Sequence, residues 1–335
     1  MTTPGLVLRL PSGRLSGRVA ARTLLVSLAL SAVTAVVFAW SMTVGDFPLS
    51  VGNVVRAVAG SGDDSDAFIV RELRLPRALV TVLAGAAFGL AGAIFQRVVR
   101  NPLATPDVIG INGGAAAGAV FAIVVLQAST RTVTGFALGG AFFAGIAIYG
   151  LAWRRGVNGY RLVLIGIGAA AMFASVVSYL LTRAQIYDAT RAVVWITGSV
   201  NGRTWDHVRP LALAMAVLVP VTLALAPRLR QLELGDDAAR GLGTHVEGAR
   251  AALLAAGVAM SAMSTAAASP VAFIALVSPQ VARRLTRDAS LGLVPAALCG
   301  SLLLLGSDLL GRRIFAPTEL PVGVVTAVLG APYLL

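Results

Sequence analysis

Lysine is absent from this 335-residue chain, and all 27 of its basic residues are arginine. A phosphate-binding P-loop needs a lysine that reaches the phosphates, so the sequence holds no nucleotide site of that kind. Enzymes that work through a lysine base or a Schiff base are excluded for the same reason. A single cysteine, Cys299, is too few for a disulfide framework or a cysteine metal site, and the two distant histidines, His207 and His245, do not suggest a metal pair.

Charged residues are also scarce. They make up 13% of the chain, against about 25% in a soluble domain. Hydrophobic residues reach 57%, and apolar runs long enough to cross a bilayer recur along the whole length. The chain is therefore a polytopic membrane protein. Its net charge of +12 is better explained by arginines placed on the cytoplasmic side than by nucleic acid, which we do not expect as a partner.

The apolar runs predict an all-α bundle of about ten transmembrane helices, with residues 1–335 forming one domain. Residues 1–22 form a cytoplasmic segment, and ten spans place both termini in the cytoplasm. A short surface helix is expected within residues 49–59. A short interfacial helix is expected in the outside segment that carries Arg183, Asp188, Arg191 and residues 194–205. The predicted spans cover residues 23–40, 78–98, 108–126, 133–153, 162–181, 210–226, 251–267, 271–285, 291–309 and 321–335.

No acidic or basic residue lies in the middle of a predicted span, and Asp308 is close to a span end. Ion-coupled carriers usually hold a charge at bilayer depth, so this absence counts against a secondary carrier. A membrane enzyme is disfavoured too, because no base or nucleophile pair is available in the bilayer. We therefore expect another protein to move this uncharged bundle.

The stretch Gly92–Ala115, GAIFQRVVRNPLATPDVIGINGGA, interrupts two apolar runs. Asn101 precedes Pro102 and is pushed out of the helical region, so the first helix should stop near Arg100. From spacing alone, an ordinary turn and a functional turn are equally good interpretations.

The largest cytoplasmic interruption contains Leu232–Gly243, LELGDDAARGLG, which predicts a short helix. Leu234, Ala238 and Leu242 share one helical face. Acidic residues stand in the first turn and an arginine near the end, as the helix dipole favours. The segment is either a solvated connector or a coupling helix that docks into a partner protein through its small apolar face.

Eight ordered motifs identify a resemblance over residues 74–335. The chain resembles the permeases of type II ABC importers for iron–siderophores, haem and cobalamin, and several segments are similar to the ferric-enterobactin subgroup. The motifs are RLPR (74–77), LAGAAFGLAGAIFQ (83–96), RNPLATPDVIGINGGA (100–115), RLVLIGIG (161–168), WITGSVNG (195–202), LELGDDAARGLG (232–243), SPVAFIALVSPQVAR (269–283) and ELPVGVVTAVLGAPYLL (319–335).

The resemblance implies a non-catalytic permease subunit in the bacterial inner membrane that imports a ferric siderophore, of catecholate type. Its implied partners are a second, homologous permease, two ATPase subunits that carry ATP and Mg²⁺, and an extracytoplasmic siderophore-binding protein. The chain itself would bind no cofactor and no metal, because the iron arrives caged. Haem, cobalamin or a hydroxamate siderophore is the alternative cargo.

The resemblance also implies three sets of site residues. The resemblance assigns Arg74 and Arg77 to binding-protein docking. In the alternative interpretation, their aliphatic stems lie on an apolar surface and their guanidinium groups reach the membrane interface. The sets are ATPase coupling at Leu234, Gly235, Asp236, Asp237, Ala239, Arg240, Leu242 and Gly243; binding-protein docking at Arg74, Arg77 and Arg312; and a gate and translocation path at Asn112, Gly113, Gly114, Gly159, Tyr160, Trp195 and Ser199.

Two positions depart from the family pattern. Ser269-Pro270 stands where the family usually has Gly-Pro, and Pro279-Gln280 stands where it usually has Pro-His. Glutamine cannot carry a charge, so we expect a structural role for Gln280 at a broken helix end.

Overall fold

The computed structural model describes residues 5–9, 16–45, 47–154, 156–287 and 292–334. These residues form a helical bundle preceded by one antiparallel hairpin, β1 (Gly5–Arg9) and β2 (Ser16–Ala20). The sequence reading of residues 1–22 did not include these strands. β2 leads directly into α1 (Ala21–Thr43).

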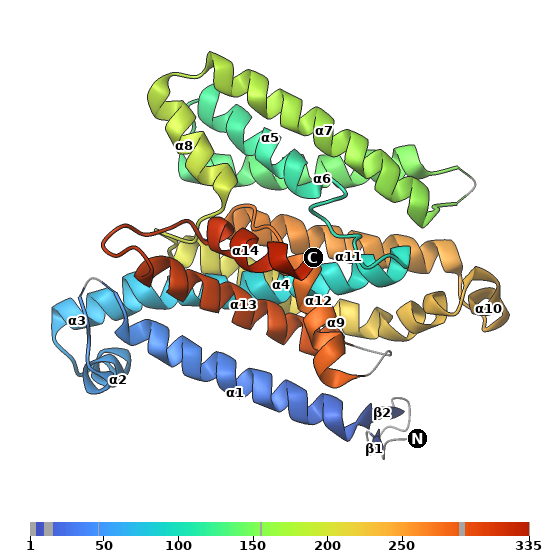
Figure 1. The fold of residues 1–335 in the computed structure, drawn as a ribbon, viewed down its shortest axis with the longest axis horizontal. Coiled ribbons are helices and arrows are strands. Elements are labelled where there is room, and N and C mark those ends of the chain that lie inside the picture. Colours follow the sequence, from blue (N-terminus) through green and yellow to red (C-terminus); the bar gives the residue numbers. More distant parts are fainter. Residues whose placement is uncertain (1–4, 10–15, 46, 155, 288–291, 335) are drawn as a thin grey trace.

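The helices form three layers with two distinct ends (Figure 1). The middle layer holds α4, α9 and α11–α14; α1 lies on one side of it, and α5–α8 on the other. One end carries α2 and α3 and is named the α2 end; the other carries α10 and is named the α10 end. The bounds are α2 (Val51–Ala59), α3 (Asp64–Phe68), the π-helix η1 (Ile69–Arg74), α4 (Leu75–Val99), α5 (Ile111–Val124), α6 (Thr130–Ala152), α7 (Gly159–Arg183), α8 (Ile186–Thr197), α9 (Trp205–Glu233), α10 (Asp236–Gly241), α11 (Val246–Ala268), α12 (Ile274–Thr286), α13 (Leu293–Arg313), α14 (Val322–Gly330) and the 3-10 helix η2 (Ala331–Leu334).

α4 is the most enclosed helix of the bundle, and small residues bring its neighbours close. A Cβ atom added at Gly85 would lie 2.4 Å from the carbonyl oxygen of Gly300 on α13, and one at Gly89 would lie 2.3 Å from that of Ala296. Backbones that approach this closely are typical of helix packing in lipid. The hydrophobic effect does not bring helices together there, and small residues allow the close van der Waals packing that does. α4 and α13 therefore form the rigid centre of the fold.

The ten predicted spans all correspond to helices, and seven helices of the described residues are long and apolar enough to cross a bilayer. The other three are shorter than predicted: α5 has 14 residues, α12 has 13 and α14 has 9. At about 1.5 Å per residue, α14 rises only about 14 Å, against a hydrocarbon core of about 30 Å. These three helices begin after a turn or a broken backbone that itself occupies part of the bundle.

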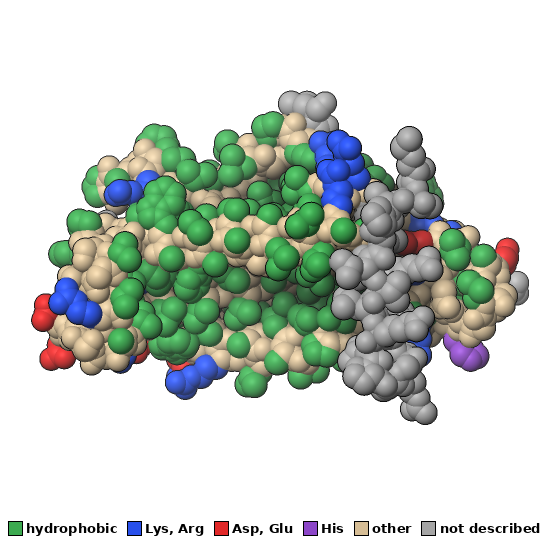
Figure 2. Space-filling view, turned by 90° about the horizontal axis from the view of Figure 1, so that it is seen from below, with side chains coloured by type: hydrophobic (Ala, Val, Ile, Leu, Met, Phe, Trp, Pro, Cys, Tyr) green, Lys and Arg blue, Asp and Glu red, His purple; other side chains and the backbone are tan. Residues whose placement is uncertain are grey.

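The outer surface is mostly apolar along the length of the bundle, with charged side chains mainly towards its two ends (Figure 2). α7 is an extreme case, since only Leu162 and Gly166 among its 25 residues are buried. Met172 and Tyr179 on this helix are 72% and 59% exposed. A surface of this kind faces lipid or another apolar protein.

Candidate functional site

The segment 232–243 does not form one short helix. α9 continues through Glu233, and only Asp236–Gly241 forms α10. Gly235 (φ +111°) and Gly243 (φ +80°) bound the new helix in backbone conformations that favour glycine. The sequence pattern predicted the exposed leucines, and Gly243 as a stop, but it missed the break at Gly235.

Asp236 is the anchor of α10. Its carboxylate accepts hydrogen bonds from Arg250 of α11, at 2.9 Å to each oxygen, and from Arg100 at the end of α4, at 3.0 Å. Burial alone would raise the pKa of Asp236, but the hydrogen bonds and charge of Arg250, with Arg100, bring it below its usual value. Arg100 also donates to the carbonyl oxygen of Leu232, at 2.5 Å. One carboxylate therefore joins α10 to α11 and α4.

The opposite side of the segment is apolar and open to solvent. Leu234 and Leu242 are 67% and 58% exposed, and Ala238 lies between them in sequence and is also exposed. Asp237 and Arg240 form an exposed ion pair of 2.9 Å on α10. Ala239, in contrast, is fully buried against the bundle. The segment thus has an anchored inner side and an unoccupied outer side.

The turn after α4 begins where the sequence predicted. Arg100 adopts a left-handed conformation (φ +55°) and ends the helix. The side chain of Asn101 accepts a hydrogen bond from the backbone N–H of Leu103, at 2.9 Å, which holds the turn around Pro102. The chain then runs to Gly110, where α5 begins.

Asn112 lies inside the bundle and is buried. Its side-chain oxygen accepts hydrogen bonds from Ser261 (3.2 Å) and Thr265 (2.9 Å) of α11, and its amide donates to Asp107. Burial raises the pKa of Asp107, in the segment linking α4 and α5, to about 7, although its bond to Asn112 acts in the opposite direction. Asn112 therefore fixes the start of α5 on α11.

Gly113 and Gly114 have different neighbours. A Cβ atom at Gly114 would lie 2.5 Å from the carbonyl oxygen of Gly140, so this glycine permits close packing of α5 on α6. A Cβ atom at Gly113 would lie 3.3 Å from Phe173 of α7. Of the three adjacent positions predicted to line the path, Gly113 is the one that faces α7.

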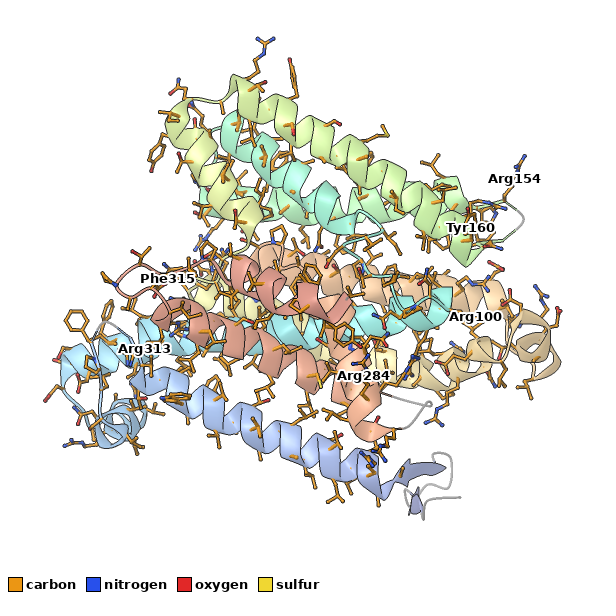
Figure 3. All side chains as sticks on the ribbon, in the orientation of Figure 1. Arg100, Arg154, Tyr160, Arg284, Arg313 and Phe315 are labelled. Atoms are coloured by element: carbon orange, nitrogen blue, oxygen red, sulfur yellow. The ribbon has the colours of Figure 1, made fainter. Side chains whose placement is uncertain are left out.

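Gly159 and Tyr160 begin α7 at the α10 end. The side chain of Asn158 accepts a hydrogen bond from the backbone N–H of Tyr160, at 2.9 Å, and so caps the helix. Tyr160 is 79% exposed, and it lies on the same end of the molecule as Arg100 (Figure 3). A Cβ atom at Gly159 would lie 2.8 Å from the carbonyl oxygen of Val99, so α7 touches the last residue of α4.

Trp195 and Ser199 lie on and just after α8, far from Tyr160 along the long axis (Figures 1 and 3). Between them Gly198 accepts a hydrogen bond from the backbone N–H of Gly323, at 3.0 Å, which joins α8 to the start of α14. The predicted gate residues therefore do not form one cluster. They are distributed along α5, α7 and α8, in the layer that Figure 1 shows beside α14.

The three arginines predicted to dock a binding protein are engaged within this chain. Arg74 is buried and donates to the carbonyl oxygens of Met42 (2.6 Å) and Phe47, so it holds the connection after α1. Arg77 pairs with Asp308 at 2.8 Å and with Glu319 at 2.9 Å. A docking role for these groups requires that the present contacts be exchanged.

Arg312 completes a cluster at the α2 end. It pairs with Asp308 one helical turn earlier, and both side chains are almost fully buried. A buried carboxylate between two arginines is tolerated because its charge is compensated, and removal of either partner is costly. Asp308 and Glu319 were absent from the predicted sites, although Asp308 and Arg312, four residues apart, were a readable signal.

The structure explains both departures from the family pattern. Ser269 has φ +64°, a region in which glycine is the usual residue, and its hydroxyl accepts a hydrogen bond from Arg203 at 2.7 Å. Gln280 donates to Gln96 of α4 at 2.6 Å, and Gln96 in turn donates to the carbonyl oxygen of Leu276 at 3.1 Å. Gln280 therefore links α12 to α4. The predicted position at a broken helix end is wrong, because α12 continues past Pro279 and Gln280 to Thr286.

Comparison with protein families decides the assignment: the FecCD transport family model matches residues 33–335. The chain belongs to the FecCD transport family. As a FecCD-family permease it has the fold predicted from its eight motifs, an all-α polytopic membrane bundle of the ABC importer class.

Relatives of this FecCD-family chain cover nearly its full length. The ferric enterobactin transport system permease protein FepG of Escherichia coli (strain K12) is 41% identical over 95% of this chain and 96% of its own. The iron(3+)-hydroxamate import system permease protein FhuG of Bacillus subtilis (strain 168) is 39% identical over 90% and 92% of the two chains.

A solved structure supports the fold. It is described as an inward-facing conformation of a metal-chelate type ABC transporter, and it matches with a TM-score of 0.83 at 23% identity. The match covers 93% of this chain and 97% of the other. The fold is thus shared at low sequence identity.

Proposed function

We propose that the chain is the permease subunit of an ATP-driven importer that carries a ferric siderophore of catecholate type into the cytoplasm. The observation that carries this proposal is the 41% identity with the ferric enterobactin permease over 95% of the chain. The permease binds no cofactor of its own, and ATP and Mg²⁺ reside on two ATPase subunits. It lies in the bacterial inner membrane, with the α10 end and both termini on the cytoplasmic side.

The coupling mechanism starts at α10. An ATPase subunit docks on the exposed Leu234 and Leu242, which offer an apolar contact beside the Asp237–Arg240 pair. Asp236 links the docked helix to Arg100 and Arg250, so movement of α10 pulls on the ends of α4 and α11. Gly235 and Gly243 flank α10, and their backbone freedom lets the helix pivot as a unit.

The translocation path lies between this permease and a second, homologous one. The exposed apolar face of α7 and that of α14, where Val328 is 66% exposed, form the contact and the path wall. Tyr160 stands at the cytoplasmic end of α7, and α8 with Trp195 and Ser199 stands at the opposite end. Gly159 packs against Val99, next to Arg100, and so connects the coupling segment to the start of α7.

A binding protein delivers the cargo at the α2 end. Its acidic side chains engage Arg77 and Arg312, which already hold Asp308 and Glu319. Glu319 keeps 29% of its side-chain surface exposed, so this pair is the one that an incoming carboxylate can displace. Arg74 acts beneath this surface by fixing the connection between α1 and α2. Such pairs orient the encounter more than they add affinity.

A hydroxamate or citrate chelate is the second candidate cargo. The hydroxamate permease FhuG is 39% identical, and the Fe(3+) dicitrate permease protein FecD of Escherichia coli (strain K12) is 38% identical over 79% of this chain. Both figures are close to that of the enterobactin relative.

The test is an ATPase-stimulation assay on the assembled complex with catecholate, hydroxamate and citrate chelates of iron, each with its loaded binding protein. The proposal predicts stimulation by the catecholate complex at the lowest concentration. Stimulation by the hydroxamate chelate alone would show that the cargo is a hydroxamate siderophore and not a catecholate.

A further inference from the structure

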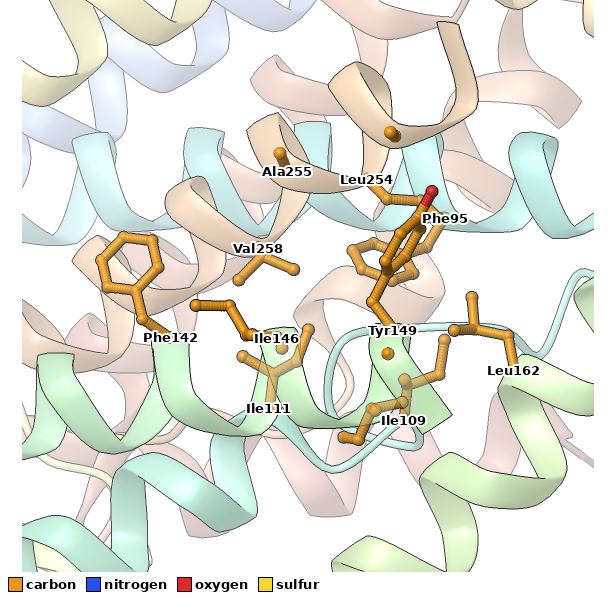
Figure 4. A pocket seen from close by; sticks show the side chains of 14 residues that line it. Phe95, Ile109, Ile111, Phe142, Ile146, Tyr149, Leu162, Leu254, Ala255 and Val258 are labelled. Carbon is orange, nitrogen blue, oxygen red and sulfur yellow. The ribbon is translucent and has the colours of Figure 1, made fainter. Parts of the chain in front are cut away.

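Two adjoining cavities lie between α6–α7 and α4–α11 at the α10 end. The inner cavity, of about 400 Å³, is lined almost entirely by apolar side chains (Figure 4). The outer cavity is polar and basic. Its charged lining consists of Arg100, Arg154, Arg161, Arg240 and Arg250 with the two carboxylates Asp236 and Glu247.

Consecutive residues of two helices line the two cavities. On α7, Arg161 lines the polar cavity, and the next residue, Leu162, lines the apolar one. On α11, Arg250 and Ala251 are divided in the same way. A single amphipathic molecule can therefore place a charged head in one cavity and a chain in the other.

The arginines of the outer cavity are not fully compensated. Arg250 pairs with Glu247 and Asp236, and Arg100 pairs with Asp236. Arg161 donates only to the carbonyl oxygen of Ala152, at 3.3 Å, and neither it nor Arg154 forms an ion pair in the described part of the chain. Arg240 pairs with Asp237, which lies outside the cavity lining. Five arginines against these three carboxylates still leave an excess of positive charge, which selects an anionic head.

The inner cavity opens on the outward side of α6, where Ile146 is 73% exposed. From Phe142 to Gly150 this side rises about 12 Å along the helix axis, enough to hold part of an acyl chain. At the same end of α6 as the arginines, the hydroxyl of Tyr149 is buried and has no hydrogen-bond partner in the described structure. A buried hydroxyl without a partner is unfavourable, and an ester or phosphate oxygen would satisfy it.

We propose that these cavities bind an anionic phospholipid from the leaflet at the α10 end. Its phosphate lies against Arg154 and Arg161, its ester region reaches Tyr149, and one acyl chain lies between α6 and α11. Basic pockets between transmembrane helices are a known chemistry for anionic headgroups. The lipid then bridges the α5–α8 layer and the α4–α11 layer beside α10.

Native mass spectrometry of the detergent-purified full chain tests the proposal. Phosphatidylglycerol and phosphatidylcholine with identical acyl chains are added in separate titrations. We expect phosphatidylglycerol to be retained at about tenfold lower concentration than phosphatidylcholine. The double variant Arg154→Gln/Arg161→Gln should lose this preference, because two cationic contacts are removed.

Two variants, each with a control, test the contacts of the lipid headgroup and of its acyl chain separately. Gly150→Leu fills the inner cavity, where an added Cβ meets no atom within 4 Å, and should reduce retention of both lipids. Gly168→Leu on exposed α7, which also meets no atom within 4 Å, should leave retention unchanged. Arg183→Gln, at the opposite end of α7, is the matched control for charge.

Equal retention of the two lipids by the natural protein would overturn the proposal. So would unchanged phosphatidylglycerol retention in both the Gly150→Leu and the double arginine variant. Competition by inorganic phosphate as effective as by the lipid would assign the arginines to a soluble anion and contradict a lipid site.

Discussion

Arg100 and Asp236 are joined by a salt bridge of 3.0 Å, although 136 positions separate them in the sequence. Arg100 ends α4, the helix at the centre of the bundle, and Asp236 begins α10. The ion pair connects the turn after α4 to the segment after α9. A movement of α10 is therefore transmitted through this ion pair to α4, at the centre of the bundle.

Asp236→Ala should uncouple ATP hydrolysis from transport. The substitution leaves Arg100 and the largely buried Arg250 without their shared carboxylate, so α10 is released from α4 and α11. We expect the complex to assemble in the membrane but to lose at least about tenfold in chelate uptake per ATP hydrolysed. Uptake and ATPase activity measured on the same proteoliposomes give this ratio.

Asp206→Ala is the matched control for Asp236→Ala. Asp206 also pairs with an arginine, Arg131 at 2.9 Å, but this pair is exposed and lies at the start of α9, at the other end of that helix from α10. Exposed pairs contribute about 0–1 kcal/mol, so its loss should change the ratio little. Equal defects in the two variants would show that the internal link is not what matters.

Leu234→Asp and Leu242→Asp should weaken assembly with the ATPase subunits. Both leucines are exposed, so the permease fold should tolerate the change, while a docked apolar face should not. Co-purification of the ATPase subunits measures the effect, and Leu213→Asn on the exposed surface of α9 serves as the comparison. Undiminished co-purification of both variants would remove this face from the interface.

Gly89→Ala should destabilise the bundle by about 1–3 kcal/mol, because its Cβ would meet the carbonyl oxygen of Ala296 at 2.3 Å. Gly306→Ala on α13 is the control, since an added Cβ there meets no atom within 4 Å. The control should be neutral or slightly stabilising, as alanine favours helix. Thermal unfolding in one detergent compares the two, and equal melting temperatures would argue against close α4–α13 packing.

Asp107 should make stability fall as the pH rises towards neutral. Burial raises its pKa to about 7, so the folded state favours the protonated acid. The unfolded chain releases that proton near pH 4, and between these values the folded state binds more protons than the unfolded one. Asp107→Asn should therefore flatten the fall in melting temperature between pH 5 and pH 8. A fall as steep as in the natural protein would show that Asp107 does not titrate in this range.

The sequence located a helix at each of the ten predicted spans, because long apolar runs indicate segments that lie in lipid. It also located the end of α4, since Asn101-Pro102 excludes a helical continuation. It overestimated α14, because hydropathy does not distinguish a helix from an equally apolar broken backbone. Gly235 could have been read as the break between α9 and α10, but the polar pattern of the segment masked it.

Side-chain partners were harder to foresee. The family resemblance assigns Asn112 to the path, and this role stays a prediction. Its contacts with Ser261 and Thr265 could not be foreseen, because they depend on α11, about 150 residues later. Arg74 and Arg77 looked like surface charges because their partners are backbone carbonyls and distant acids. Sequence patterns predict local geometry, whereas the roles of these residues are set by tertiary contacts.

The most direct test is uptake of radiolabelled iron, as the catecholate chelate, into proteoliposomes that contain the assembled complex and its loaded binding protein. The account predicts accumulation that requires ATP, does not respond to a proton or sodium gradient, and is lost with Asp236→Ala while ATP hydrolysis continues. Accumulation driven by an ion gradient without the ATPase subunits would contradict it.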